Sequence, residues 1–492
     1  MSVMGELQAQ LAPTIESFIE NLRELKLVDM RSRSKAHSRP SAADVGLNWG
    51  DVEYYGLKAE QSKFPGSHKI HRSIGEYFPM ELTTRKLLDM CGQVFGLSFS
   101  RLSGDESGNF KKRYIQTKKW PKSDSKDLLV FKVHDTSTGS HGALLGVLLL
   151  DLVDKKSKPQ GAQCGTFGQC EVKNLGSQKW SPAIYIRAVF PPARKDAPVL
   201  VSSYNVITLA HELGHAIQEF TRGGLDSMAW DSVEIASHLV ERLVSEPAVQ
   251  RELSSHYVYE QQAYLDAWST SGRSLPPKQA PLDLLEKGVD MYLHDQILPF
   301  LRTLWFTKLD FILHSFTEEM LDAVDLGVEC QKALSEWTGI CGTDDSNYGP
   351  PKNNEYLHYR HYQYYYTSLY CYPYSKICAE EIFQTHFVKD PLNRTQGLRF
   401  RKTFLEHRDV FQTQAHRDLF LQKNGEGAEA KLERDLWLSG RSENSMDALV
   451  KFLGRPPKMK PFVDYMSGVT RERETSRQAM WSWKKILAKV VS

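Results

Sequence analysis

The sequence lacks the features that mark several classes of protein. Its longest apolar run, GALLGVLLLDLV at residues 142–153, is far shorter than the about 20 residues that a membrane-spanning helix needs. Basic and acidic side chains nearly balance, at 62 and 60, so the chain has no overall surplus of positive charge for nucleic acid. We therefore expect no membrane insertion and no nucleic-acid partner.

Cysteine is also scarce. The chain has seven cysteines, and none belongs to a CxxC pair. An odd number without regular spacing is typical of reduced thiols in a reducing compartment rather than of a disulfide framework. The first 26 residues show no charged-then-apolar secretory signal, and they contain acidic residues that mitochondrial transit peptides avoid. From these residues alone we expect no targeting signal.

The remaining composition is that of a large globular protein. Hydrophobic residues make up 41% and charged residues 25% of the 492 positions, which is ordinary for a folded chain. Apolar residues at helical spacing between 6 and 26 give way to a Ser/Arg/Pro-containing stretch at 31–43, which we interpret as a linker. We therefore separate an N-terminal helical segment with its linker, residues 1–47, from the main region, residues 48–492.

Local patterns predict a mainly α-helical protein with a small β-sheet. We expect one helix between about 76 and 100 and a mostly helical region from about 205 to 455. Between them, two apolar runs separated by TSTGSHG predict a hairpin, and AIYIRAVF at 183–190 predicts a third strand. The small sheet therefore precedes a helix that carries a metal-binding pattern.

That pattern is His-Glu-Leu-Gly-His at residues 211–215. Positions i and i+4 share one face of a helix, so His211 and His215 can hold one metal ion together. Glu212 would lie beside the ion without binding it, where it can take a proton from the attacking water and pass it to the leaving amine. An ordinary helix with two surface histidines remains the alternative. The apolar residues that fall largely on the opposite side, and so predict packing into a core, are Val206, Leu209, Leu213, Ile217 and Phe220.

A catalytic zinc site needs a third protein ligand, and the following segment offers candidates. WDSVEIASHLVERLV at 230–244 predicts a second amphipathic helix, preceded by a glycine-containing turn. Glu234 falls in its first turn, near the point where an antiparallel helix would pass the histidines, and is our third ligand. His238 and Glu241 share the face of Glu234, so either is an alternative ligand. For Glu241 we favour a supporting contact to a zinc histidine, and for His238 a partly exposed position.

Tyrosine is concentrated in YLHYRHYQYYYTSLYCYPYSKICAEEIF at 356–383. Most of these rings are expected to serve packing, because tyrosine suits cores and interfaces. A zinc peptidase also needs a donor for the oxyanion that forms on the attacked carbonyl, and a tyrosine hydroxyl or histidine N–H is a usual supplier. A few of the rings could therefore contact substrate.

Together, these motifs resemble the thimet oligopeptidase family of zinc metallopeptidases. The resemblance runs from about residue 48 to the end of the chain and combines HELGH, the Asp231-x-x-Glu234-x-x-Ser237-x-x-x-Glu241 pattern and the His/Tyr-rich segment ending at Ser375. Flanking stretches such as NWGDVEYYGLKAE and DPLNRTQGLRFRKTFLEH are similar to the mitochondrial intermediate peptidase subfamily.

The resemblance implies a fold, a reaction and a set of residues. The fold would be a mostly helical, zincin-type core with a deep channel and a small sheet near one Zn2+ ion, and residues 1–47 would be the remnant of a larger N-terminal region. The reaction would be hydrolysis of peptides or of N-terminal segments of imported mitochondrial precursors in the matrix, by a monomer. The implied roles are zinc ligation by His211, His215 and Glu234, general base catalysis by Glu212, support of the ligands by Glu241 and Asp231, and contact with substrate and transition state by His361, Tyr365 and Tyr372.

Two other functions stay open at this point. The chain could be a zinc-binding homologue that binds peptides or a partner without cleaving them, or a cytoplasmic general oligopeptidase. Glu212 favours catalysis over binding alone, because a binding protein has no need of a base beside the metal ligands. Cobalt or manganese could replace zinc, since two imidazoles and a carboxylate accept other divalent ions.

Overall fold

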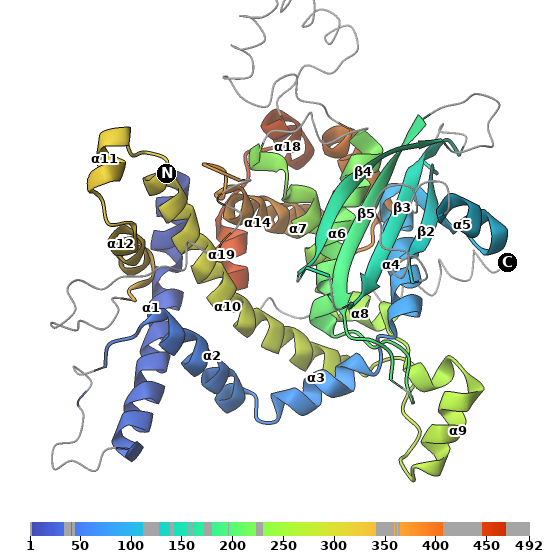
Figure 1. Cartoon of the computed structure of the whole chain (residues 1–492), viewed down its shortest axis with the longest axis horizontal. Coiled ribbons are helices and arrows are strands. Elements are labelled where there is room, and N and C mark those ends of the chain that lie inside the picture. The colour runs from blue at the N-terminus through green and yellow to red at the C-terminus, as the bar shows by residue number, and fades with distance from the viewer. Residues whose placement is uncertain are drawn as a thin grey trace, which may run out of the picture. The chain divides into compact units, whose positions relative to one another are not determined.

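The structure is a computed structural model of the 492-residue chain (Figure 1). The residues that it describes are 2–33, 41, 45–111, 127–137, 142–155, 158–159, 161–171, 180–194, 196–222, 230–340, 359, 362, 365–406 and 445–468. They fall into two compact units. The first unit contains Met1–Lys69, Asp290–Ile377 and the segment that begins at Lys458, and the second contains Ile70–Val289 and Cys378–Pro457. Among the described helices, none is long and apolar enough to cross a membrane. The division into segments 1–47 and 48–492 stays a prediction.

The first unit is helical. Apolar residues recur every three or four positions along α1 (Ser2–Arg33), and the buried ones among them are Met4, Leu7, Leu11, Ile15, Phe18, Ile19 and Leu22. They join a core in which the Trp49 and Trp305 rings lie 5.1 Å apart and the Trp305 indole donates to the Cys330 carbonyl oxygen at 2.9 Å. The other helices wholly within this unit are α2 (Trp49–Lys63), α11 (Glu318–Ala323), α12 (Leu326–Thr338) and α19 (Lys460–Met466).

Three helices contain a boundary between the units: α3 (Ser67–Gly75), α10 (Leu282–Leu313) and α14 (Cys371–Ile382). The second unit holds the remaining helical elements. They are α4 (Met80–Phe95), α5 (Gly104–Phe110), α6 (Ser203–Arg222), the 3-10 helix η4 (Trp230–Ser232), α7 (Ile235–Val244), α8 (Pro247–Leu253), the 3-10 helix η5 (Tyr257–Tyr259), α9 (Gln262–Thr270), the π-helix η7 (Phe383–Phe387), α15 (Arg394–Phe400), the π-helix η8 (Arg401–Leu405) and α18 (Ser445–Leu453). The predicted mainly helical class with a small sheet is confirmed.

The second unit is built on a five-stranded sheet with the order β1-β2-β3-β5-β4. Its strands are β1 (Leu97–Arg101), β2 (Leu129–Asp135), β3 (Leu144–Val153), β4 (Gln163–Glu171) and β5 (Trp180–Phe190). β2 and β3 form the predicted hairpin, and β5 contains the predicted third strand and pairs with β3 in parallel. β4 was not predicted, because Gln163–Glu171 is rich in glycine and glutamine and lacks a strong β pattern. It occupies an edge of the sheet.

Residues Val147 to Leu152 of β3 are buried without interruption, which explains why the sequence here is apolar except at Asp151 and does not alternate. Val147 and Leu149 contribute to a cluster that includes Phe110 of α5. On the opposite face, the close contact of Gly146 with the Phe220 ring of α6 fixes that helix against the sheet. Figure 1 shows α6 running along the sheet.

One predicted helix is shorter than expected. We predicted a helix from about 76 to 100, but α4 covers only Met80–Phe95 and residues 97–101 form β1. Gly96 adopts the left-handed conformation, with φ of 69°, and its amide donates to the Gly92 carbonyl oxygen. A glycine in this conformation ends a helix with little steric cost, so the chain turns directly into the sheet.

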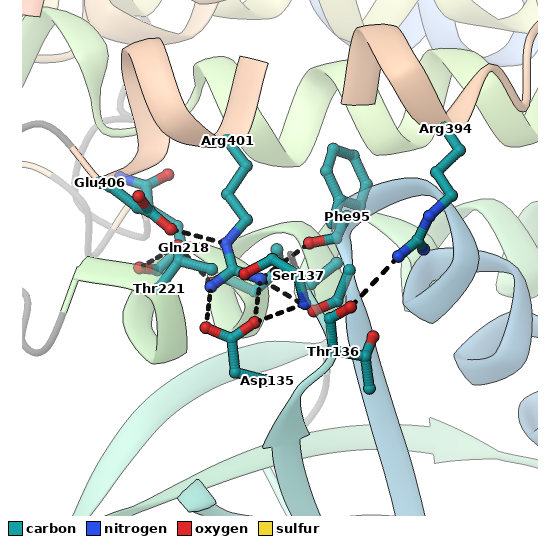
Figure 2. A network of polar contacts seen from close by, with 11 residues as sticks. Phe95, Asp135, Thr136, Ser137, Gln218, Thr221, Arg394, Arg401 and Glu406 are labelled. Carbon is teal, nitrogen blue, oxygen red and sulfur yellow. Dashed lines mark hydrogen bonds and ion pairs between the residues drawn. The ribbon is translucent and has the colours of Figure 1, made fainter. Parts of the chain in front are cut away.

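Arg401, at the start of η8, joins the end of α4 to the end of β2 (Figure 2). Its guanidinium donates to both carboxylate oxygens of Asp135, at 3.0 and 2.6 Å, and to the carbonyl oxygens of Phe95 and Gly96. Its Nε donates to Glu406 at 2.8 Å. The arginine side chain is only 3% exposed. Its bidentate pair with Asp135 therefore connects the start of η8 and the end of α4 to the end of β2.

Candidate active site

The HELGH pattern lies in the middle of α6. The five apolar residues predicted to face the core are all buried, so the amphipathic character of this helix is confirmed. His211 and His215 project from the other side, with side chains 19% and 17% exposed. Their ring centroids lie 5.0 Å apart, as the i, i+4 spacing requires.

α7 approaches α6 extremely closely at one point. A Cβ atom on Gly214 would lie 2.5 Å from Ser237 Cα and 2.8 Å from the Ala236 carbonyl oxygen. Only glycine fits there, which brings the start of α7 next to the two histidines. The sequence predicted a helix over residues 230–244 with Glu234 in its first turn. The structure instead places Asp231 in η4 and Glu234 at the N-cap of α7, with φ −101° and ψ 1°.

Glu234 points at both histidines of the pattern. Its Oε2 lies 3.0 Å from His215 Nε2 and 3.3 Å from His211 Nε2. In a tetrahedral zinc site with bonds of about 2.0–2.1 Å, neighbouring ligand atoms are about 3.3 Å apart. The two separations therefore fit a shared metal ion. Ser237 Oγ donates to Glu234 Oε2 at 2.9 Å and fixes the carboxylate, which is 2% exposed.

Glu241 contacts two imidazoles behind this cluster. Its Oε2 lies 3.2 Å from His211 Nδ1 and 2.9 Å from His238 Nδ1. An ionised carboxylate only accepts hydrogen bonds, so each imidazole carries a proton on Nδ1, and a metal ion would bind at Nε2 in place of a proton there. We expected His238 to be partly exposed, but it is 6% exposed. The ligand atoms of His211, Glu234 and His238 lie within 4.8 Å of one another, in a group that does not include His215, so His238 is also an alternative to His215 as the second histidine ligand.

Glu212 is 7% exposed and lies beside the edge strand β4. Burial raises the pKa of its carboxyl, while the charges of His211 and His215 and a backbone hydrogen bond from Cys164 oppose that rise. A carboxyl with a raised pKa in a buried position is suited to receiving and returning a proton. Cys164 was missed by the sequence analysis, because its strand is distant in the sequence and carries no motif.

The electrostatics of the cluster follow from the buried carboxylates. Burial lowers the pKa of His211, but hydrogen bonds to Glu234 and Glu241 outweigh this and raise it to about 10. Burial raises the pKa of Glu234, but the charge of His215 and hydrogen bonds from both histidines hold it well below its usual range. The cluster thus keeps an ionised carboxylate beside two imidazoles, which suits a divalent cation.

The predicted substrate-binding residues belong to the other unit. His361 lies outside the described residues. Tyr365 and Tyr372 lie in the first unit, where their ring centroids are 5.5 Å apart with an interplanar angle of 36°. Their contact with substrate, like the role of Asp231, stays a prediction.

A sequence profile of peptidase family M3 matches residues 1–407, a range that includes HELGH, Glu234 and Glu241. Saccharolysin of Saccharomyces cerevisiae is 23% identical over 416 residues, which are 82% of this chain and 51% of that protein. Mitochondrial intermediate peptidase of Rattus norvegicus is 23% identical over 412 residues, 81% of this chain and 51% of its own length. Oligopeptidase A of Escherichia coli is 26% identical over 300 residues, 59% of this chain and 37% of its own. The chain thus spans about half the length of the first two of these curated relatives.

Proposed function

This chain belongs to peptidase family M3, and on that premise we propose that it is a zinc-dependent endopeptidase that cleaves peptides or unfolded segments of proteins. One observation carries the proposal: Glu234 Oε2 lies 3.0 Å from His215 Nε2 and 3.3 Å from His211 Nε2. Glu212 lies between these two histidines in the sequence. Peptidases of this family are generally zinc-dependent. Two imidazoles and one carboxylate are also the donor set of catalytic zinc in thermolysin-type sites, which leaves a fourth position open.

Each residue has a distinct task in this proposal. His211, His215 and Glu234 hold the ion, and Glu241 orients His211 through its Nδ1. The bound zinc would supply Lewis acidity, which activates water and polarises a carbonyl. Glu212 takes the proton from the attacking water and returns it to the leaving amine. Tyr372, Tyr365 and His361 bind substrate, and Tyr372 and His361 also stabilise the oxyanion.

The substrate and the compartment are finer proposals. We favour N-terminal segments of imported precursors in the mitochondrial matrix, because the chain is similar to mitochondrial intermediate peptidases of Rattus norvegicus, Mus musculus and Arabidopsis thaliana. General oligopeptide cleavage in the cytoplasm is the alternative, supported by similarity to oligopeptidase A. A library of peptides that includes precursor N-termini distinguishes the two substrate classes.

The test compares two matched substitutions of buried carboxylates, Glu212→Gln and Glu234→Gln, with wild-type protein. We expect zinc-loaded wild-type protein to cleave library peptides. E212Q should retain zinc but lose at least about a hundredfold in kcat, because it lacks the base. E234Q should lose zinc as well, because a ligand is gone. Zinc is measured by elemental analysis after gel filtration, and cleavage by mass spectrometry. Equal cleavage by wild-type protein and E212Q would contradict the proposal.

A further inference from the structure

A buried aspartate holds the loop that precedes α14. Asp310 lies on α10 and is completely buried. Its Oδ1 accepts a hydrogen bond from the Thr367 amide at 3.0 Å, and its Oδ2 accepts one from the Leu369 amide at 3.2 Å. His314 Nδ1 lies 3.0 Å from the same Oδ1. Both oxygens of one carboxylate thus serve the backbone of a three-residue stretch, 57 residues further along the chain.

The backbone at Thr367 is strained. Its φ is 57°, and it is the only residue other than glycine with a positive φ among the described positions. A β-branched side chain is disfavoured in this left-handed region, because its Cβ crowds the backbone. Such a conformation persists only where the surroundings impose it. The two hydrogen bonds to Asp310 do so, since they fix the amides on either side of Ser368.

This loop connects two of the predicted substrate-binding residues. The Ser368 amide donates to the Tyr365 carbonyl oxygen at 2.8 Å, and the Tyr372 amide donates to the Leu369 carbonyl oxygen at 3.3 Å. Leu369 itself is 1% exposed within the core of the first unit. The loop backbone therefore sets the positions from which Tyr365 and Tyr372 project, and the two rings contact each other.

We propose that Asp310 is a positioning residue for substrate binding: its buried carboxylate holds the Thr367–Leu369 backbone in a strained conformation and so fixes the Tyr365–Tyr372 pair. The inference rests on the proposed peptidase function and deepens it, because it assigns the geometry of two substrate contacts to a residue that touches neither substrate nor metal. A carboxylate that only stabilised α10 would not need to hold this loop in a strained conformation.

The test uses the full chain and four variants: D310N, T367P, T367G and the double variant D310N/T367G. Asparagine keeps the size of the side chain but replaces one acceptor by an N–H group that faces a donor. Proline at position 367 removes the amide donor and fixes φ near −65°, without touching the core. Glycine at position 367 adopts a positive φ without strain. Zinc content, kcat and KM are measured for each variant on a peptide that the wild-type protein cleaves.

We expect D310N and T367P each to lower kcat/KM by about tenfold or more with full zinc content, because displaced substrate-binding groups impair binding and orientation. T367G should lose less than T367P. The loss caused by D310N should be smaller in the T367G background, because glycine holds the conformation without the two hydrogen bonds. This coupling distinguishes a positioning role from a purely structural one.

Three results overturn the inference. One is an unchanged kcat/KM in D310N or T367P. The second is a D310N loss of equal size with threonine or glycine at position 367. If D310N does not fold, T367P and T367G alone test the inference. The third overturning result is then an equal kcat/KM for these two variants. Failure of the proposed function gives a different pattern, in which zinc-loaded wild-type protein cleaves no peptide at all and both claims fall.

Discussion

At the scale of single residues, the candidate site depends on one carboxylate oxygen shared by two histidines. Glu241 Oε2 lies within 3.2 Å of Nδ1 of both His211 and His238, so it orients a proposed ligand and a residue that we do not assign to the metal. We assign His215 and not His238 as the second histidine ligand for two reasons. His215 shares a helix face with His211, and its Nε2 is 3.0 Å from Glu234 Oε2. In this view, His238 serves to hold Glu241.

The sequence identified the two HELGH histidines as candidates, because their i, i+4 spacing places them on one helix face. It identified Glu234 because a second, antiparallel helix was expected to pass them at that residue. The sequence could not show the burial of His238 or the contact of Cys164 with Glu212, because both depend on which faces of α6, α7 and β4 meet. The strained loop at Thr367 was also invisible. Its cause, Asp310, is remote in sequence and belongs to no motif.

At the scale of elements, the site depends on the contact between α6 and α7 at Gly214. Substitution G214A adds a Cβ that would lie 2.5 Å from Ser237 Cα, a backbone atom that cannot move without displacing Glu234. We expect a loss of about 1–3 kcal/mol in the free energy of unfolding and weaker zinc binding, despite the higher helix propensity of alanine. Chemical denaturation and competition with a zinc chelator measure the two effects.

The matched control is G56A in α2, where the added Cβ meets only Leu298 Cδ2 at an ordinary 3.6 Å. There the helix propensity of alanine should raise stability by up to about 1 kcal/mol. If G214A behaves like G56A, the close approach does not determine the site.

Element boundaries also mark the limit of sequence-based prediction. Apolar runs predicted the β2–β3 hairpin and β5, because buried strands leave a strong signal. The helix predicted from about 76 to 100 is confirmed only for Met80–Phe95. It ends there because a single glycine adopts the left-handed conformation. β4 had no signal of its own, since an edge strand is held by its neighbour β5 and not by a strong pattern.

At the scale of the whole molecule, the Asp135–Arg401 pair joins segments 266 residues apart within the second unit. Burial raises the pKa of Asp135, but hydrogen bonds from Arg401 and Ser137 outweigh it and hold that pKa below its usual value. A lowered pKa in the folded state stabilises the protein above the unfolded pKa of about 3.9. That contribution is lost as the pH falls through the lower, folded pKa.

We therefore expect D135N to lower the free energy of unfolding at pH 7 by about 3 kcal/mol, because it removes the bidentate carboxylate partner of a buried guanidinium and leaves its charge paired with Glu406 alone among the described residues. The difference from wild-type protein should shrink as the pH falls below about 4. The exposed Asp154 provides the control D154N, which should change little at any pH. Urea unfolding across the pH range measures this. A D135N deficit that is constant with pH would show that the ion pair is not its cause.

The central claim is that His211, His215 and Glu234 hold one zinc ion, and the most direct measurement is the zinc content of purified H215A and H238A at matched zinc loading. Our account predicts one zinc per chain in the wild-type protein, loss of zinc in H215A, and retention in H238A with at most weakened affinity. Loss of zinc in H238A together with full zinc in H215A would contradict the account and make His238 the second histidine ligand.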